Sequence, residues 1–169
     1  VVGDEAGTAL TTGDSNVAVG YAALDSEDTG SKNTAIGNAA LSTLNVDGAA
    51  YNTAVGADAG LSVTTGTSNN LVGGLGGDAL TVGSYNQVLG TAALGADTQG
   101  SRSIAIGHAA LLAQNFTTAT DVYNVAIGHN AGLSVTTGTF NVLLGGLAGD
   151  VLTDADYNIG VGYAALGAD

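Results

Sequence analysis

Residues 124–128 read Asn-Val-Ala-Ile-Gly, and the pattern Asn-x-x-(Val/Ile/Leu)-Gly returns along the whole chain of 169 residues. The glycine that closes it, called the core glycine below, recurs at nine successive intervals, seven of 17 residues and one each of 19 and 21. A fixed period of this kind indicates a repeat architecture. The longer intervals place small insertions near residues 44–50 and 113–122 of a single repeat domain, residues 1–169. The core glycines are Gly3, Gly20, Gly37, Gly56, Gly73, Gly90, Gly107, Gly128, Gly145 and Gly162.

Several other positions of the repeat keep one residue type. An aliphatic residue always precedes the core glycine, a small residue stands three positions after it, and a second glycine often follows ten positions after it. A longer period is also present, because residues 51–97 match residues 123–169 at 31 of 47 positions. Asparagine stands four positions before the core glycine at Asn16, Asn33, Asn52, Asn69, Asn86, Asn124, Asn141 and Asn158, and Ser103 is the exception.

These features predict an all-β fold, a parallel β-solenoid of about ten coils with one 17-residue repeat per coil. The repeat is too short for a pair of helices, and its β-branched residues favour strands. Coils that stack at the strand spacing of about 4.8 Å would bring equivalent residues into ladders along the rod. We expect the aliphatic column to fill the interior and the asparagine column to form a stacked ladder in which each amide binds the next.

Composition and charge exclude several classes of function. The chain has 15 acidic residues against two basic ones, a net charge of −13, which repels the phosphates of nucleic acids. No apolar run approaches the ~20 residues that a membrane-spanning helix needs, so we expect no membrane insertion. Cysteine is absent, which excludes disulfides and thiol catalysis and is compatible with an extracellular location.

The segments 16–20, 33–37, 103–107 and 124–128 resemble the head repeats of YadA-like trimeric autotransporter adhesins. They are also similar to the Asn-x-Ala-Val-Gly repeats of phage tail fibres and bacterial surface proteins. The resemblance covers essentially the whole chain. It implies a left-handed parallel β-roll, often trimeric, in an extracellular fibre or adhesin on a cell or virion surface.

Two sets of residues are weak candidates for metal binding. His108 and His129 each follow a core glycine in consecutive coils, so stacking could bring them to one metal ion. Asp78 and Asp150 lie in glycine-rich segments similar to the calcium-binding nonapeptides of RTX proteins. Each segment is isolated in the 17-residue repeat, whereas calcium-binding nonapeptides occur in tandem, so glycine turns are the preferred interpretation. We therefore expect no structural metal or other cofactor, with Ca²⁺ as the open alternative.

A column of aromatic residues precedes the asparagine column and also contains Lys32 and Arg102. Its rings could simply stack along the rod, or they could contact a neighbouring chain or a glycan. A column of threonines, interrupted by Asp28, is the feature that would suit an ice-binding solenoid. The aromatic column comprises Tyr51, Tyr85, Tyr123, Phe140 and Tyr157.

No grouping of nucleophile, base or paired carboxylates is recognisable, so we expect no enzyme. Neither end of the repeat carries a recognisable cap, and open strand edges favour pairing with other chains. The sequence therefore predicts a non-enzymatic structural protein that assembles with copies of itself. The copies would form a filament stacked through the solenoid ends, or a homotrimer. The alternatives are an adhesin or tail-fibre shaft that binds a surface receptor or glycan, and an ice-binding solenoid.

Overall fold

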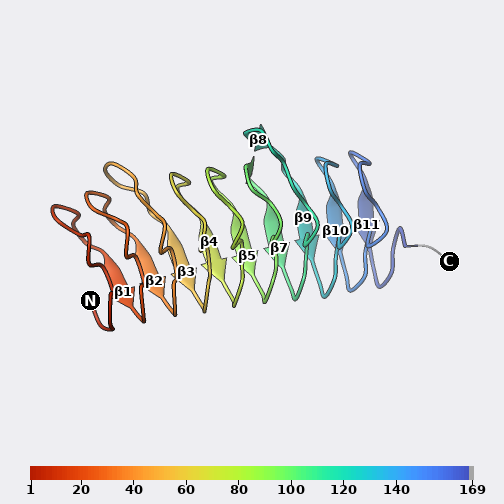
Figure 1. Ribbon diagram of the computed structural model, residues 1–169. Helices are drawn as coiled ribbons and strands as arrows, with labels where there is room; N and C mark the ends of the chain where they lie inside the picture. Colours follow the sequence, from red (N-terminus) through yellow and green to blue (C-terminus); the bar gives the residue numbers. More distant parts are fainter. Residues whose placement is uncertain (168–169) are drawn as a thin grey trace.

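The computed structural model describes residues 1–167 as a rod of stacked coils, with its two ends far apart (Figure 1). Nine strands of three residues form one parallel sheet along the rod, and β6 (Gly100–Ser101) pairs with β8 (Thr120–Asp121) beside it. The predicted all-β parallel solenoid is thus confirmed. The nine strands, in order, are β1 (Val17–Val19), β2 (Thr34–Ile36), β3 (Thr53–Val55), β4 (Asn70–Val72), β5 (Gln87–Leu89), β7 (Ile104–Ile106), β9 (Val125–Ile127), β10 (Val142–Leu144) and β11 (Ile159–Val161).

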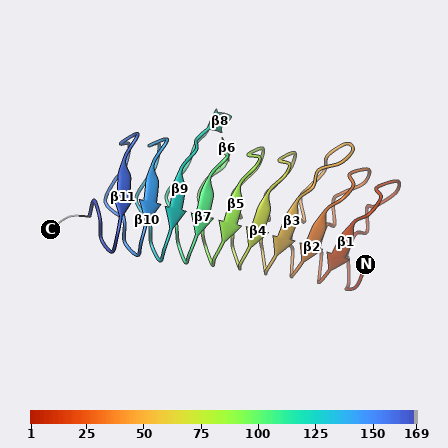
Figure 2. The same ribbon diagram turned by 180° about the vertical axis from the view of Figure 1, so that it is seen from behind.

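Neighbouring strands lie side by side along the rod (Figure 2), and they pair without any shift in register. Ala54 of β3, for example, lies opposite Ala35 of β2 and Leu71 of β4. The two long repeats do not disturb this register, because β7 and β9 pair in the same way across the second insertion. Each column of the repeat is therefore a ladder along the rod.

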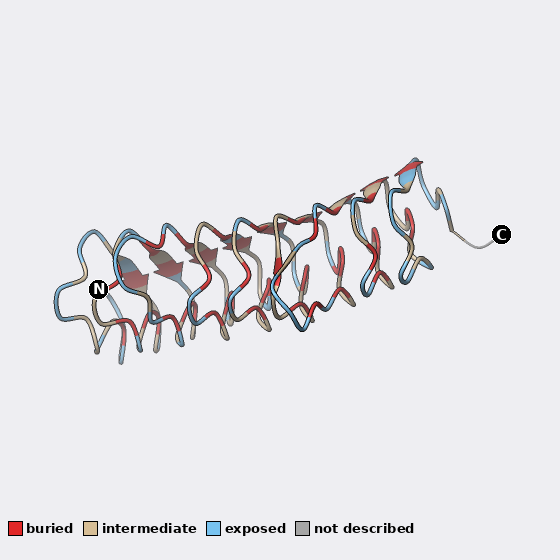
Figure 3. Ribbon diagram, turned by 90° about the horizontal axis from the view of Figure 1, so that it is seen from above, coloured by how far each residue is buried: buried red, intermediate tan, exposed pale blue. Residues whose placement is uncertain are grey.

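The interior is filled from the middle of each strand, and the aliphatic residue before the core glycine faces outward. Ala18 and Leu71 are fully buried, whereas Ile36 and Leu89 are 38% and 51% exposed. Successive side chains in a strand point to opposite faces, so only one of the two columns can face inward. The prediction that the aliphatic column fills the interior is therefore wrong. Figure 3 shows the alternation of buried and exposed segments along each coil.

Large and small residues complement each other between facing walls of the core. Leu71 projects from the sheet toward two glycines, Gly60 and Gly77, that stand four positions after their core glycines. A Cβ atom at these glycines would lie 2.6 Å and 3.0 Å from the δ-carbons of Leu71. Where this opposite position is leucine, as at Leu41, the strand residues facing it are alanines. This exchange of volume accounts for the four-coil period in the sequence.

The turns of each coil use backbone conformations that side chains rarely adopt. Leu24 and Tyr85 have φ angles of 56° and 62°. A left-handed residue costs roughly 1–2 kcal/mol, so the surrounding structure must hold it in place. The stacked coils do so: the N–H of Leu24 donates to the carbonyl of Ala40 at 3.0 Å, and that of Tyr85 donates to Thr67 at 3.0 Å.

The asparagine column is buried, and its hydrogen bonds run mainly to the backbone. The Oδ1 atom of Asn52 accepts the backbone N–H of Asn69 at 3.0 Å, and its Nδ2 donates to the carbonyl of Gly66 at 2.8 Å. The same backbone acceptance recurs in most coils. Amide-to-amide bonds of the expected kind occur from Asn141 to Asn124 and from Asn158 to Asn141. Six of the eight asparagines, all but Asn33 and Asn158, thus fasten their own coil to the turn of the next one.

Candidate interaction face

The outer side of the nine-stranded sheet is the most apolar surface of the rod. The first and third residues of every strand point outward there, and we call these 18 positions the aliphatic face. Side chains alternate between the two sides of a strand, so the first and third residues point outward when the middle residue points into the core. The third residues are Val19, Ile36, Val55, Val72, Leu89, Ile106, Ile127, Leu144 and Val161, and the first residues are Val17, Thr34, Thr53, Asn70, Gln87, Ile104, Val125, Val142 and Ile159.

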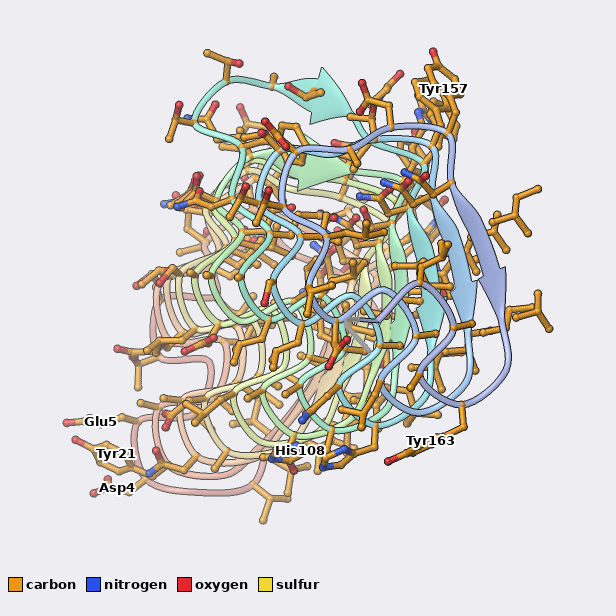
Figure 4. The ribbon with its side chains drawn as sticks, turned by 90° about the vertical axis from the view of Figure 1, so that its right-hand side faces the viewer. Asp4, Glu5, Tyr21, His108, Tyr157 and Tyr163 are labelled. Atoms are coloured by element: carbon orange, nitrogen blue, oxygen red, sulfur yellow. The ribbon has the colours of Figure 1, made fainter. Side chains whose placement is uncertain are left out.

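The aliphatic face carries no charged residue, although the chain has 15 acidic residues and a net charge of −13. Some of the acids gather far from it: viewed along the rod, Asp4 and Glu5 lie at the corner opposite Tyr157 (Figure 4). The carboxylate of Glu5 interacts with the Tyr21 hydroxyl and raises the pKa of Tyr21 above its usual value. The sheet therefore separates an uncharged apolar surface from a strongly acidic remainder.

The aliphatic face differs between its two halves. In β2 to β5 the first strand residues are polar, and the amide of Asn70 donates to that of Gln87 at 2.7 Å. From β7 to β11 the same column contains only isoleucine and valine. The half that carries β7 to β11 is consequently apolar in both columns, and the other half alternates between polar and aliphatic columns.

The predicted aromatic residues lie where the chain enters the strands, at the edge of the aliphatic face, and we call this row the aromatic stripe. Phe140 stacks on Tyr123 and Tyr157, with ring centroids 5.4 Å and 5.0 Å apart. Stacked rings turn their edges outward and cover each other's faces. A glycan that packs on ring faces would therefore find only the last ring of this stack open.

Both cations of the chain lie within the aromatic stripe. The Lys32 ammonium group lies 4.9 Å from the centroid of the Tyr51 ring and donates to its hydroxyl at 3.0 Å. The Arg102 guanidinium lies over the Tyr85 ring at 4.9 Å and forms an ion pair with Asp121 at 2.9 Å, which raises its pKa further. The aromatic rings thus cover the only two positive charges at the border of the aliphatic face.

The candidate metal ligands do not form a cluster. His108 and His129 are exposed and stack with an interplanar angle of 12°, so their ring planes run parallel instead of converging on one point. Asp78 lies away from Asp150, and its pKa is raised by burial. Within residues 1–167, no three histidine, cysteine, aspartate or glutamate residues are grouped as a metal site would require.

Two acidic residues of the chain lie in the interior of the rod. Glu27 and Asp97 have no exposed surface, and their carboxylates accept backbone N–H groups from Gly30 and Gly100. Burial raises the pKa of Asp97 above the ordinary value for aspartate. Their position in the repeat distinguishes them from the other acids, because it is aliphatic in most other repeats.

The buried Asp97 should make stability fall as pH rises. Because its pKa is higher in the folded than in the unfolded chain, the folded chain binds the proton more tightly. The contribution is therefore complete below the ordinary aspartate pKa and is lost as pH rises through the folded value. The measurement is the unfolding free energy against pH for the wild type and Asp97→Asn. The difference between the two curves should decline over this window, and a difference that grows with pH would contradict the assignment.

The part of the chain that the structure describes has no cavity or cleft, and none of its segments is a helix long and apolar enough to cross a membrane. The threonine column is occupied in hydrogen bonding between coils. The hydroxyls of Thr64 and Thr81 donate to the carbonyls of Thr81 and Thr98. The extended surface that combines size, exposure and uniform chemistry is thus the aliphatic face. The chain matches no protein-family model, and no curated protein or solved structure is significantly similar to it.

Proposed function

We propose that this chain is a non-enzymatic structural subunit of an extracellular fibre or shaft, in which copies pack side by side through their aliphatic faces. The carrying observation is a surface along the whole sheet that is uncharged and mostly aliphatic, on a chain with a net charge of −13. Large exposed apolar patches mark interaction sites in soluble proteins. Side-by-side packing is favoured over stacking through the ends because this surface is the feature that needs a partner.

A second copy is the occupant that suits this surface best. Two aliphatic faces can meet without burying any charge, so the association would avoid the desolvation cost of ionic groups. The acidic remainder of each rod would point away from the contact and keep the assembly soluble. A cationic partner would instead be drawn to the acidic sides and would leave the aliphatic face exposed.

The dimensions agree with a stable contact. Nine strands at a spacing of about 4.8 Å, with three residues across, give a flat area of about 38 by 10 Å. Two such faces would bury about 760 Å² in total, and about 1,200 Å² once the aromatic stripe is included. That value reaches the range of specific protein–protein interfaces.

The two unlike halves of the aliphatic face favour a parallel, in-register arrangement. In that arrangement the apolar half from β7 to β11 packs against the same half of the next copy, and Asn70 and Gln87 meet polar groups. In an antiparallel arrangement the apolar half would cover the polar residues of β2 to β4, and the hydrogen-bonding groups of Asn70 that Gln87 does not satisfy would lose their contact with water, which costs free energy. Parallel packing is also what the resemblance to trimeric adhesin heads implies.

Two lysines on the aliphatic face should dissociate the assembly. The double variant Ile106→Lys/Ile127→Lys places charges at the centre of the proposed contact, where burial is costly. We expect size-exclusion chromatography with light scattering to give a multiple of 16.2 kDa for the wild type and a 16.2 kDa monomer for the variant.

The matched control is Thr65→Lys/Thr137→Lys, which adds the same charge at exposed positions outside the aliphatic face. It should assemble like the wild type, and circular dichroism should show that all three chains remain folded. A monomeric wild type, or equal loss of assembly in both variants, would contradict side-by-side packing.

A further inference from the structure

Both insertions interrupt the hydrogen bonds between coils at the same place. Where two coils of ordinary length meet, the N–H eight positions after the core glycine donates to the equivalent carbonyl of the next coil, as Thr64 does to Thr81 and Thr136 to Thr153. Gly66 and Gly138 share these two acceptors, whereas Gly13 and Gly83 make no such bond. Asp28 and Thr98, which precede the insertions, have no bond of this kind either. The insertion at 44–50 and the longer one at 113–122, which includes β8 (Figure 1), push the next coil outward at this point. The glycines that face the insertions, Gly30 and Gly100, have no backbone acceptor of this kind.

A buried carboxylate supplies the missing acceptor in both cases. Oε1 of Glu27 accepts the N–H of Gly30 at 2.6 Å, and Oε2 accepts that of Val46 in the inserted coil at 3.3 Å. Oδ1 of Asp97 accepts the N–H of Gly100 at 3.0 Å and that of Phe116 in the inserted coil at 3.1 Å. Each carboxylate therefore joins an ordinary coil to the enlarged coil that follows it.

The two acids occupy the same position of the repeat, seven residues after the core glycine. Among the residues that the structure describes, an acid stands at this position only in the two coils that precede an insertion. The glycine at Gly30 or Gly100 makes room for the carboxylate, because a Cβ atom at either site would collide with it. Among residues 1–167, the aliphatic occupants of this position are Leu10, Leu44, Val63, Leu80, Val135 and Leu152.

Asp97 belongs to a larger network of buried hydrogen bonds than Glu27 does. Beside Asp97, the side chain of Gln114 donates to the carboxylate at 2.6 Å and accepts from Asn124 at 2.9 Å. Ser103, the one exception in the asparagine column, receives a further bond from Gln114. At the shorter insertion, leucine replaces this glutamine and the Nδ2 of the buried Asn33 has no hydrogen-bond partner. The longer insertion is therefore supported by the larger polar network.

We infer that Glu27 and Asp97 are clips that let a coil carry an inserted loop without loss of the sheet register. The acid substitutes for the carbonyl that the insertion displaces, and the strands on either side stay in phase, as β7 and β9 do. An acid in place of the aliphatic core residue is stabilising only where a loop follows. The loops are thus positions at which the rod can present variable sequence while its core stays unchanged.

The test compares Asp97→Leu in two backgrounds by thermal unfolding. One background is the natural chain, and the other lacks residues 117–120 and carries Gln114→Leu, which restores an ordinary 17-residue coil. With the loop present, Asp97→Leu leaves two buried N–H groups without an acceptor, and we expect Tm to fall by about 5–10 °C. Without the loop, the same change should leave Tm unchanged or raise it.

If Asp97→Leu prevents folding of the chain with the loop but not of the chain without it, that result also supports the inference. An equal loss of Tm in both backgrounds, or failure to fold in both, would overturn the inference. The converse variant is Leu80→Asp, which introduces the acid ahead of a coil of ordinary length. Leu80→Asp should lower Tm. Replacement of residues 117–120 by Gly and Ser keeps the loop length and changes its sequence, and it should shift Tm by less than about 2 °C.

Discussion

Replacement of Gly73 by alanine is expected to lower the free energy of unfolding by about 4 kcal/mol or more. The core glycine has a φ angle of 132°, which residues with a side chain rarely adopt, and a Cβ atom there would lie 2.5 Å from the carbonyl oxygen of Gly90. That atom belongs to the backbone of the next coil, so relief of the overlap would require the two coils to separate. Equilibrium denaturation by urea measures the effect.

The adjacent Gly74→Ala is the matched control. A Cβ atom at Gly74 would lie no closer than 3.7 Å to any neighbour, and its φ angle is outside the strained range. We expect the control to change the unfolding free energy by less than about 0.5 kcal/mol. Equal effects of the two substitutions would show that the coils do not approach each other at the core glycine.

Replacement of Leu71 by alanine should cost about 3 kcal/mol, because it opens a cavity in the thin core. Leu71 is fully buried and fills the space that Gly60 and Gly77 leave on the opposite wall. Gly60→Leu, when combined with Leu71→Ala, reproduces the arrangement around Leu41. Leu41 has the same left-handed backbone as Gly60 and faces alanines. Gly60→Leu alone should overpack the core, but the double variant should recover at least half of the loss.

A double-mutant cycle measures this coupling, with the unfolding free energies of the four chains taken from urea denaturation. Leu75→Ala is the control for loss of a leucine, because Leu75 lies at a turn with 44% of its surface exposed. It should cost less than about 1 kcal/mol. Strictly additive effects of Leu71→Ala and Gly60→Leu would contradict the exchange of volume between the two walls.

The repeat and its glycines made the solenoid predictable, because a fixed 17-residue period with stacked small residues permits few other folds. The direction in which the strands face was not predicted correctly. Hydrophobicity alone favoured the aliphatic column for the interior, although the middle residues, such as Ala18 and Ala35, are small. The two-residue period of a strand could have shown the correct direction. Lys32 and Arg102 lie an even number of residues before the aliphatic column, so they are expected on the same side of the strand. Long charged side chains are rarely buried, so that side should face outward.

The two buried acids were not predictable from composition, since an isolated acid in a repeat is usually solvated. Their position is informative only when it is combined with the length of the repeat that follows. The repeat that follows Glu27 has 19 residues, and the one that follows Asp97 has 21. The hydrogen bonds of Asn52 and its equivalents also depend on the turn that each amide reaches in the next coil. Contacts of this kind follow from the three-dimensional stacking and not from the column itself.

Cross-linking through single cysteines tests side-by-side packing most directly, because the natural chain contains no cysteine. Ile36→Cys and Leu144→Cys place one thiol at β2 and one at β10 of the aliphatic face, and Thr137→Cys is the control outside it. Each chain is treated alone, and the first two also as a mixture, with a short bis-maleimide. Parallel, in-register packing predicts that Ile36→Cys and Leu144→Cys each cross-link to themselves, well above Thr137→Cys. Cross-links only in the mixture would show antiparallel packing, and cross-links no stronger than those of Thr137→Cys would contradict association through the aliphatic face.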